Sequence, residues 1–209
     1  MIVKVCGMRE ADNIRAVELA ARPDWMGFIF WPRSSRYVAD VPAYLPTACA
    51  RVGVFVDEDA AGILRRVGDF GLAAVQLHGH ETPAFLRDLR RRLPAGVAIL
   101  RALPVAAPAD LAAADGYTGA AAPDAFLFDA KAALPGGNGT QFDWSVLRAY
   151  RGAVPFLLSG GIGPDDAAAV RAFSHPRCLG IDLNSRFETA PAVKDAAALG
   201  AFIAQVTNT

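Results

Sequence analysis

The sequence predicts an α/β protein with a single (β/α)8 barrel, the TIM-barrel fold, over residues 1–209. Eight short apolar runs recur along the chain, and the first residues of successive runs lie 22 to 30 positions apart. Continuous apolarity over the length of a strand is typical of strands that are buried on both faces, as in a parallel barrel. Several intervals between the runs carry helical periodicity. A barrel of eight such units needs roughly 200 residues, and this chain reaches that size.

The expected strands follow directly from the apolar runs. They cover residues 2–6, 25–30, 52–56, 74–77, 98–102, 125–129, 155–159 and 179–183. No stretch rich in Pro, Gly and Ser divides the chain, so we predict one domain. A doubly wound open sheet is the alternative, but such a sheet usually has about five or six strands, and two units would remain unplaced.

Four helices are expected between the strands. They cover residues 11–21, 82–93, 165–173 and 193–206. The first has apolar residues at Ile14, Val17 and Leu19 with charged residues between them. The second opens with Thr82, a capping residue, followed by Pro83 at the first helical position. The third follows a Gly-Pro turn, and the last is amphipathic. Residues 103–119 are rich in alanine, and their periodicity predicts no clear element.

Composition and charge exclude several classes of function. Hydrophobic residues make up 53% of the chain and charged residues 20%, as in ordinary globular proteins. Lys and Arg together number 21, as do Asp and Glu, so the balanced charge predicts no binding to nucleic acid or to an anionic membrane. No apolar stretch reaches the ~18 residues of a membrane-spanning helix, and the start lacks the layout of a signal peptide. The three scattered cysteines form no disulfide framework, so we expect a cytoplasmic protein.

Two strand ends carry candidate catalytic residues, because barrel enzymes place their chemistry at the carboxyl ends of the strands. Cys6 ends the first strand, and Lys4 lies two residues earlier on the same face. A nearby ammonium favours the reactive thiolate, but a free cysteine is equally often a small buried hydrophobe. Asp129 ends the sixth strand, where it is either a general acid at an apolar rim or a turn-forming cap. The residues alone leave both pairs of alternatives open.

Glycine-rich loops follow the seventh and eighth strands, where barrels often bind phosphate. Residues 159–163 are Ser-Gly-Gly-Ile-Gly, and the backbone amides of such a loop can approach an anion closely. Residues 180–185 supply the second half of such a site. Arg36, in the loop after the second strand, either binds a carboxylate or is an ordinary exposed arginine. The glycine-rich loop 135–140 is either mobile or folds over a ligand.

Taken together and in chain order, these residues resemble the phosphoribosylanthranilate isomerase family of tryptophan biosynthesis. The motifs that carry the resemblance are Lys4-Val5-Cys6-Gly7-Met8, Gly27-Phe28-Ile29-Phe30, Ser34-Ser35-Arg36-Tyr37-Val38, Val52-Gly53-Val54-Phe55, Val75-Gln76-Leu77-His78-Gly79, Phe126-Leu127-Phe128-Asp129, residues 136–139 leading to Phe142-Asp143-Trp144, Leu158-Ser159-Gly160-Gly161 and residues 180–185. Each glycine motif is weak singly, but the ordered set covers nearly the whole chain and is specific. Ser35, where many relatives have Pro, and the large Trp31 depart from the family pattern.

The resemblance implies an isomerase that converts N-(5-phosphoribosyl)anthranilate to 1-(2-carboxyphenylamino)-1-deoxyribulose 5-phosphate by an Amadori rearrangement. It implies Cys6 as general base, Asp129 as general acid and Arg36 on the ring carboxylate. Substrate binding, that of the phosphate included, falls to Gly160, Gly161, Asp182, Asn184 and Ser185. Lys4 leads us to expect a lowered pKa for the Cys6 thiol. No metal, nicotinamide or flavin is implied, and the chain is expected to be a monomer or a homodimer that binds a phosphorylated aminosugar.

Three other interpretations compete with this one. The nearest is another phosphate-binding barrel, such as the isomerase of histidine biosynthesis or the tryptophan synthase α-subunit. The histidine enzyme is typically longer and has a catalytic Asp in each of two similar halves, whereas the first strand here ends in Cys6. An inactive scaffold barrel is expected to lack Cys6, Asp129 or Arg36, and all three are present. A thiol hydrolase needs a base beside Cys6, and His78 belongs to another strand. His78 and His80 alone do not predict a metal site.

Overall fold

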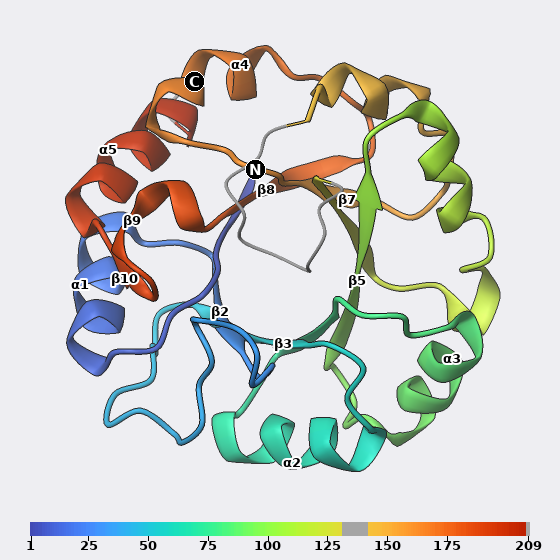
Figure 1. The fold of residues 1–209 in the computed structure, drawn as a ribbon, viewed down its shortest axis with the longest axis horizontal. Coiled ribbons are helices and arrows are strands. Elements are labelled where there is room, and N and C mark those ends of the chain that lie inside the picture. The colour runs from blue at the N-terminus through green and yellow to red at the C-terminus, as the bar shows by residue number, and fades with distance from the viewer. Residues whose placement is uncertain (131–141, 208–209) are drawn as a thin grey trace.

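Eight parallel strands close into a barrel in the computed structural model, which describes residues 1–130 and 142–207 (Figure 1). The strands are β1 (Ile2–Val5), β2 (Trp25–Ile29), β3 (Ala50–Phe55), β4 (Ala74–Leu77), β5 (Ala98–Val105), β6 (Ala125–Ala130), β7 (Phe156–Leu158) and β8 (Cys178–Leu183). Each strand pairs with its neighbours in sequence, and β1 pairs with β8, with Lys4 opposite Asp182. The predicted fold class is therefore confirmed.

Helices cover most of the outside of the barrel, and a connection without a helix lies between α1 and α2 (Figure 1). The α-helices are α1 (Ala11–Ala21), α2 (Ala60–Phe70), α3 (Pro83–Arg92), α4 (Ala167–Ala172) and α5 (Ala196–Thr207). Short 3₁₀ helices are η1 (Pro108–Ala114), η2 (Gly119–Ala121), η3 (Trp144–Ala149), η4 (Pro164–Asp166) and η5 (Ser185–Phe187). A two-stranded antiparallel hairpin, β9 (Glu188–Ala190) and β10 (Val193–Lys194), precedes the last helix. Within the described part of the chain, no helix has the length and apolarity needed to cross a membrane.

The predicted elements agree with the structure in most places, and several differ. Strand β4 and helix α1 have the bounds that the sequence predicts, whereas α2 is not among the predicted helices. The segment 30–49 after β2 contains no helix, and only 3₁₀ turns follow β5 and, among the residues from 142 onward, β6, so the prediction of eight full strand-then-helix units is wrong. The last helix begins at Ala196 instead of residue 193, because Val193 and Lys194 pair with β9. The glycine-rich loop 135–140 lies outside the described residues.

Side chains fill the interior of the barrel in layers, as in other barrels of this size. One layer contains Val52, Ala74, Leu100 and Ala125, and all four are buried. Two residues further along the strands, a second layer contains Ala102, Leu127 and Leu157. Polar side chains replace this packing at the carboxyl end, where Lys4, Gln76 and Ser159 are buried. The polar part of the barrel interior therefore lies at that end.

A buried carboxylate fastens the long connection between β2 and β3 to helix α1. Glu18 accepts hydrogen bonds from the backbone amides of Thr47 and Ala48, each at 2.6 Å, and from the Tyr44 hydroxyl. Burial alone would raise the pKa of Glu18, but these three donors stabilise the ionised form and lower it below 4.5. The connection thus keeps its shape without a helix of its own.

Replacing Glu18 by Ala is expected to lower the free energy of unfolding by about 2 kcal/mol, because two amides lose their acceptor. A folded-state pKa below 4.5 means that this contribution is present above pH 4.5 and is lost as the pH falls through the lower folded value. Urea unfolding of the wild type and of Glu18→Ala at several pH values measures the difference. The exposed Glu10→Ala is the control, and an equal loss in both variants would contradict the anchoring role.

Candidate active site

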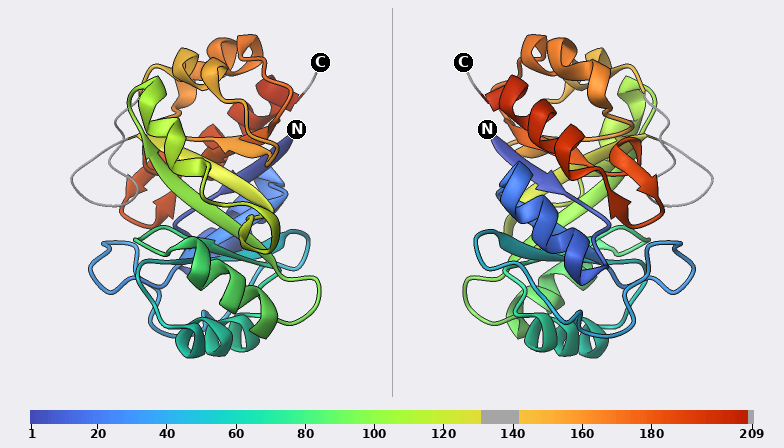
Figure 2. Two further views of the ribbon diagram at one scale, coloured as in Figure 1. Left: turned by 90° about the vertical axis from the view of Figure 1, so that its right-hand side faces the viewer. Right: turned by 90° about the vertical axis from the view of Figure 1, so that its left-hand side faces the viewer.

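The candidate catalytic residues gather at one end of the barrel, because parallel strands present their carboxyl ends on the same side. Cys6 directly follows β1, Asp129 lies at the end of β6, and Arg36 lies in the connection after β2. The β9–β10 hairpin lies at this end too, on the far side of the barrel from the N-terminus (Figure 2). The structure thus brings the predicted acid, base and carboxylate-binding residues to one rim.

Cys6 is enclosed at the rim, with 4% of its surface exposed. Its backbone amide donates to the Leu183 carbonyl at 2.8 Å, which continues the pairing of β1 with β8. Gly27 on β2 provides the space for the thiol, since a Cβ at this position would lie 2.8 Å from the Cys6 sulfur. Glycine is required at position 27 because the Cys6 side chain packs directly against the β2 backbone. This contact explains the glycine in the motif that begins at Gly27.

The expected lowering of the Cys6 pKa is wrong. Burial raises the pKa of the Cys6 thiol above 9.0, and the attraction of Lys4 offsets only part of that rise. Asp182 on β8 adds to the effect of burial: its charge also raises the pKa of the thiol, and its Oδ1 accepts a hydrogen bond from the Lys4 Nζ at 2.8 Å. Lys4 is fully buried and pairs with this carboxylate. The Cys6 side chain is therefore a thiol at rest.

Asp129 is partly open to solvent and contacts a histidine. The side chain is 19% exposed, and its Oδ1 accepts the amide of Ala130 at 2.9 Å. Its Oδ2 lies 3.5 Å from Nε2 of His78, whose Nδ1 lies 3.4 Å from Nε2 of Gln76. Gln76 belongs to β4, and His78 is the residue that follows this strand. No catalytic role for His78 is predicted from the sequence, since its distance from Asp129 depends on how β4 and β6 sit across β5.

Asp182 lies between the two halves of the site. Burial raises its pKa, Lys4 opposes that rise, and the charges of Asp129 and His78 also act on it. Only its Oδ1 has a hydrogen-bond partner among residues 1–130 and 142–207. The remaining oxygen is available to a ligand hydroxyl.

Arg36 is held by a residue that the sequence analysis does not single out. Its Nε and Nη2 donate to the Glu188 carboxylate at 2.8 and 2.6 Å. Lys194 donates to the same carboxylate at 2.6 Å from the other side of the hairpin. Glu188 lies 152 positions from Arg36, and no local pattern links the two. The only signal in the sequence is a glutamate and a lysine placed shortly after the predicted phosphate loop.

The predicted phosphate loops lie beside each other at the same rim. Gly160 and Gly161 have φ values of +87° and +69°, which favour glycine, and the Ser159 hydroxyl donates to the Phe128 carbonyl at 2.7 Å. A Cβ on Gly163 would lie 3.1 Å from Nε of Arg186, so this exposed guanidinium lies over the loop. Arg186 is a second residue that the sequence analysis does not single out.

The second half of the predicted phosphate site begins where β8 ends. The Asn184 side chain accepts a hydrogen bond from the Lys194 Nζ at 2.7 Å, and its backbone carbonyl accepts one from the Phe187 amide at 3.2 Å. Ser185 is half-buried and starts η5. Asn184 therefore connects the phosphate end of the site to the hairpin that holds Arg36.

Comparison with known families decides between the rival barrels. The family model described as N-(5'phosphoribosyl)anthranilate (PRA) isomerase matches residues 3–205. The chain belongs to the PRA isomerase family. A relative from Phocaeicola vulgatus with that enzyme name is 50% identical over 206 residues, which cover 99% of this chain and 98% of the relative.

Solved structures of PRA isomerases agree with this assignment. The crystal structure of the Thermus thermophilus protein is similar at a TM-score of 0.83 and 29% identity, and the match covers 100% of this chain and 99% of that one. Another PRA isomerase, solved in complex with reduced 1-(o-carboxyphenylamino)-1-deoxyribulose 5-phosphate, matches at a TM-score of 0.77 and 27% identity over 100% of both chains. The resemblance seen in the motifs is thus confirmed.

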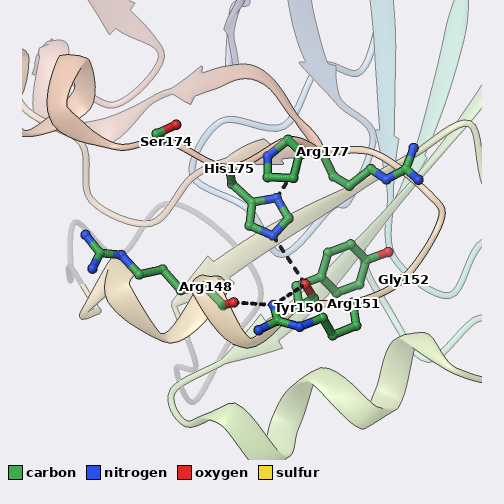
Figure 3. A pocket seen from close by; sticks show the side chains of 8 residues that line it. Arg148, Tyr150, Arg151, Gly152, Ser174, His175 and Arg177 are labelled. Carbon is green, nitrogen blue, oxygen red and sulfur yellow. Dashed lines mark hydrogen bonds between the residues drawn. The ribbon is translucent and has the colours of Figure 1, made fainter.

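A separate cleft of about 480 Å³ lies at the opposite end of this PRA isomerase family barrel, before β7 and β8. It contains three arginines around His175, which is 3.2 Å from the Tyr150 carbonyl. Arg148 and Arg177 extend to opposite sides of His175, and Arg151 donates to backbone carbonyls (Figure 3). The guanidinium groups do not converge on a common point. Since no strand presents its carboxyl end there, this cleft is not the candidate active site.

Metal ligands do not cluster in the part of this PRA isomerase family chain that the structure describes. No group of three or more His, Cys, Asp or Glu side chains there is placed to hold an ion. His80, the second histidine of the sequence motif, contacts Asp57 at 2.9 Å and is exposed. The two histidines of the motif therefore belong to different environments.

Proposed function

We propose that this chain isomerises N-(5-phosphoribosyl)anthranilate to 1-(2-carboxyphenylamino)-1-deoxyribulose 5-phosphate with Asp129 as general acid and Cys6 as general base. The isomerase activity itself follows from membership of the PRA isomerase family. The assignment of roles rests on the placement of both residues at the carboxyl rim, where side chains no longer fill the barrel.

The first step opens the ribose ring. Asp129 donates its proton to the ring oxygen, and the bond from that oxygen to C1 breaks. The nitrogen lone pair forms the C1–N double bond of a protonated imine. Asp129 becomes a carboxylate and lies 3.5 Å from Nε2 of His78, a donor that stabilises the charge when that nitrogen carries a proton.

The second step moves a proton from C2. The protonated imine withdraws electrons, so the C2 proton becomes acidic, and the Cys6 thiolate removes it to give an enolamine. The C2 hydroxyl then loses its proton and C1 gains one, both by exchange with solvent, which yields the ketone with the C–N bond intact. Asp129 regains from solvent the proton that it gave, and Cys6 releases the one that it took. The negative charge of the Cys6 thiolate lies close to Lys4. The ion pair with Asp182 holds the Lys4 side chain in place in the interior of the barrel.

Binding groups at two ends hold the sugar between acid and base. We place the ring carboxylate on Arg36, the phosphate on the amides of Gly160, Gly161 and Ser185, and a sugar hydroxyl on the free oxygen of Asp182. Asn184 contributes from the end of β8. Positioning of this kind contributes several kcal/mol to lowering the barrier. The small phosphorylated substrate, the cytoplasmic location and a monomeric or dimeric state all remain predictions.

The experiment that tests the function follows the fluorescence of the anthranilate adduct, with the substrate generated in situ. Purified wild type is expected to remove the fluorescence in proportion to its concentration. A folded protein without turnover would contradict the substrate assignment and would leave the other sugar-phosphate barrels as candidates. The fold assignment would stand in either case.

Replacing Arg186 by Met is expected to weaken phosphate binding. The guanidinium lies over Gly163 and adds positive charge beside the predicted cradle, so its loss should raise KM by roughly tenfold, the value of one charge-assisted hydrogen bond. Competitive inhibition by inorganic phosphate should weaken by a similar factor. Arg171→Met, on α4 and bonded to the Gln205 carbonyl, is the control. An unchanged inhibition constant would show that Arg186 does not face the phosphate.

A further inference from the structure

The predicted carboxylate-binding residue, Arg36, belongs to a buried cluster of three charged side chains. Glu188 lies between Arg36 and Lys194, and the side chains of Arg36, Glu188 and Lys194 are 12%, 6% and 0% exposed. Burying several charges costs free energy unless they are paired well, and apolar side chains of the same size would often be at least as stable. Stability alone therefore does not explain why these three charges are buried together.

The way in which Glu188 holds Arg36 leaves one edge of the guanidinium open. Both contacts to the carboxylate use Nε and Nη2, the side edge of the group. Nη1 has no hydrogen-bond acceptor within residues 1–130 and 142–207. The end edge, formed by Nη1 and the second proton of Nη2, can bind a further carboxylate through two hydrogen bonds. Glu188 thus fixes the direction in which Arg36 presents its free fork.

The charges of the cluster do not balance by themselves. Arg36 and Lys194 are cationic and Glu188 is anionic, so the cluster carries one net positive charge. Burial alone would raise the pKa of Glu188, but the hydrogen bonds and charges of Arg36 and Lys194 lower it, which keeps the carboxylate ionised. A ligand carboxylate on Arg36 would bring the net charge to zero. Without Lys194, the same ligand would leave an uncompensated negative charge in a buried site.

The backbone around the cluster is built to bring these groups together. Gly7 has a φ of +76°, and a Cβ there would lie 2.7 Å from both the Arg36 Cδ and the Asn184 Oδ1, and 3.4 Å from the Lys194 Nζ. Ala192 in the hairpin turn is fully buried with a φ of +66°, an unfavourable conformation for alanine, and its amide donates to Glu188 at 3.2 Å. Such strain persists where the surroundings enforce it, and it is often found at functional sites.

We propose that Glu188 and Lys194 are positioning residues for carboxylate recognition: Glu188 orients the free edge of Arg36, and Lys194 supplies the charge that the substrate carboxylate balances. The proposal rests on the proposed function, since it deepens the role given there to Arg36. It assigns to the β9–β10 hairpin the selection of a ring with an ortho carboxylate over the same ring without one.

The test compares the binding of two probes by titration calorimetry. One is reduced 1-(o-carboxyphenylamino)-1-deoxyribulose 5-phosphate, and the other is the phenylamino compound that lacks only the carboxylate. In Lys194→Met, the dissociation constant of the first probe should rise by about tenfold or more, and that of the second should change by less than about twofold. Thr189→Ala, an exposed position on β9, is the control for damage to the hairpin and should bind both probes as the wild type does.

Glu188→Gln separates orientation from charge. Removing the negative charge makes the subsite more positive, so charge alone predicts tighter binding of the carboxylated probe. Loss of orientation predicts weaker binding of that probe, and this is the expected result. Tighter binding would overturn the role of Glu188, and equal losses for both probes in either variant would reduce the hairpin to a structural element.

A double variant covers the case in which a single change prevents folding. Removing one partner leaves a buried charge unpaired, whereas Glu188→Gln/Lys194→Met removes both opposite charges together. This variant should fold, and Arg36 alone still balances the charge of the ligand carboxylate, so its expected loss of preference for the carboxylated probe reports on orientation. A retained preference would overturn the orienting role of Glu188. Failure of the proposed function has a different signature, because the wild type itself would then neither bind the probes nor consume the substrate.

Discussion

Asn in place of Asp129 is expected to reduce turnover by roughly 10²- to 10⁴-fold, the usual contribution of a general acid. The amide has the size of the carboxyl group and can still accept the Ala130 amide through Oδ1. It has no carboxyl proton to give to the ring oxygen, so the ring stays closed. Fluorescence turnover measures the loss, and calorimetric binding of the reduced product analogue is expected to stay close to the wild-type value.

The control for this variant lies at the other end of the same strand. Asp124 precedes β6, and its Oδ2 accepts from the Ile99 amide and from Arg90. Asp124→Asn makes the same chemical change 5 positions away in the sequence and is expected to cost stability without affecting turnover. Near-normal turnover in Asp129→Asn would remove Asp129 from the mechanism. Loss of both turnover and ligand binding would indicate a role in binding instead.

The strands of this protein can be predicted well because each buried strand is a continuous apolar run in the sequence. The run at 74–77 is buried at every position, and its bounds agree with β4. The helix at 11–21 likewise buries Ile14 and Val17, although Leu19 is exposed. The β9–β10 hairpin could not be predicted, because its formation depends on long-range contacts. Lys194 pairs with Glu188 and is fixed to helix α1 through Asn13, whose side chain bonds both its amide and its carbonyl.

In the candidate site, too, local features could be predicted from the sequence and long-range contacts could not. Cys6 and Asp129 can be found because they end strands, and a barrel places all strand ends together. The effect of Lys4 on Cys6 could not be read from spacing along β1, since its partner Asp182 lies 178 positions away. Barrel closure sets Lys4 opposite Asp182, and this pairing changes the electrostatics of the thiol. A charged neighbour predicts a pKa shift only when the partners of that neighbour are known.

The raised pKa of Cys6 makes the activity depend on pH in a defined direction. Only the thiolate can remove the C2 proton, and burial holds the pKa of the thiol above 9.0. Between pH 7 and pH 9 the thiolate fraction should therefore rise by about tenfold per pH unit, and the residual kcat of Asp129→Asn, which has no acid proton to lose, should rise with it. In that variant, a rate that is independent of pH over this range, with chemistry limiting, would contradict the thiolate as base.

Cys6→Ser is expected to lower kcat by roughly 10²- to 10⁴-fold, because a serine hydroxyl does not ionise in this range and general-base catalysis contributes that much. Gly27 leaves room for the side chain at position 6, since a Cβ on Gly27 would lie 2.8 Å from the Cys6 sulfur. Serine is smaller than cysteine and fits in the same space, so the fold should persist. Cys178→Ser is the matched control: this thiol lies at the start of β8 and contacts the Gly180 carbonyl, away from the rim. Loss in Cys6→Ser alone, with disappearance of the alkaline rise when the change is combined with Asp129→Asn, would identify the base. Equal turnover in both variants would move that role to another residue and leave the isomerase assignment intact.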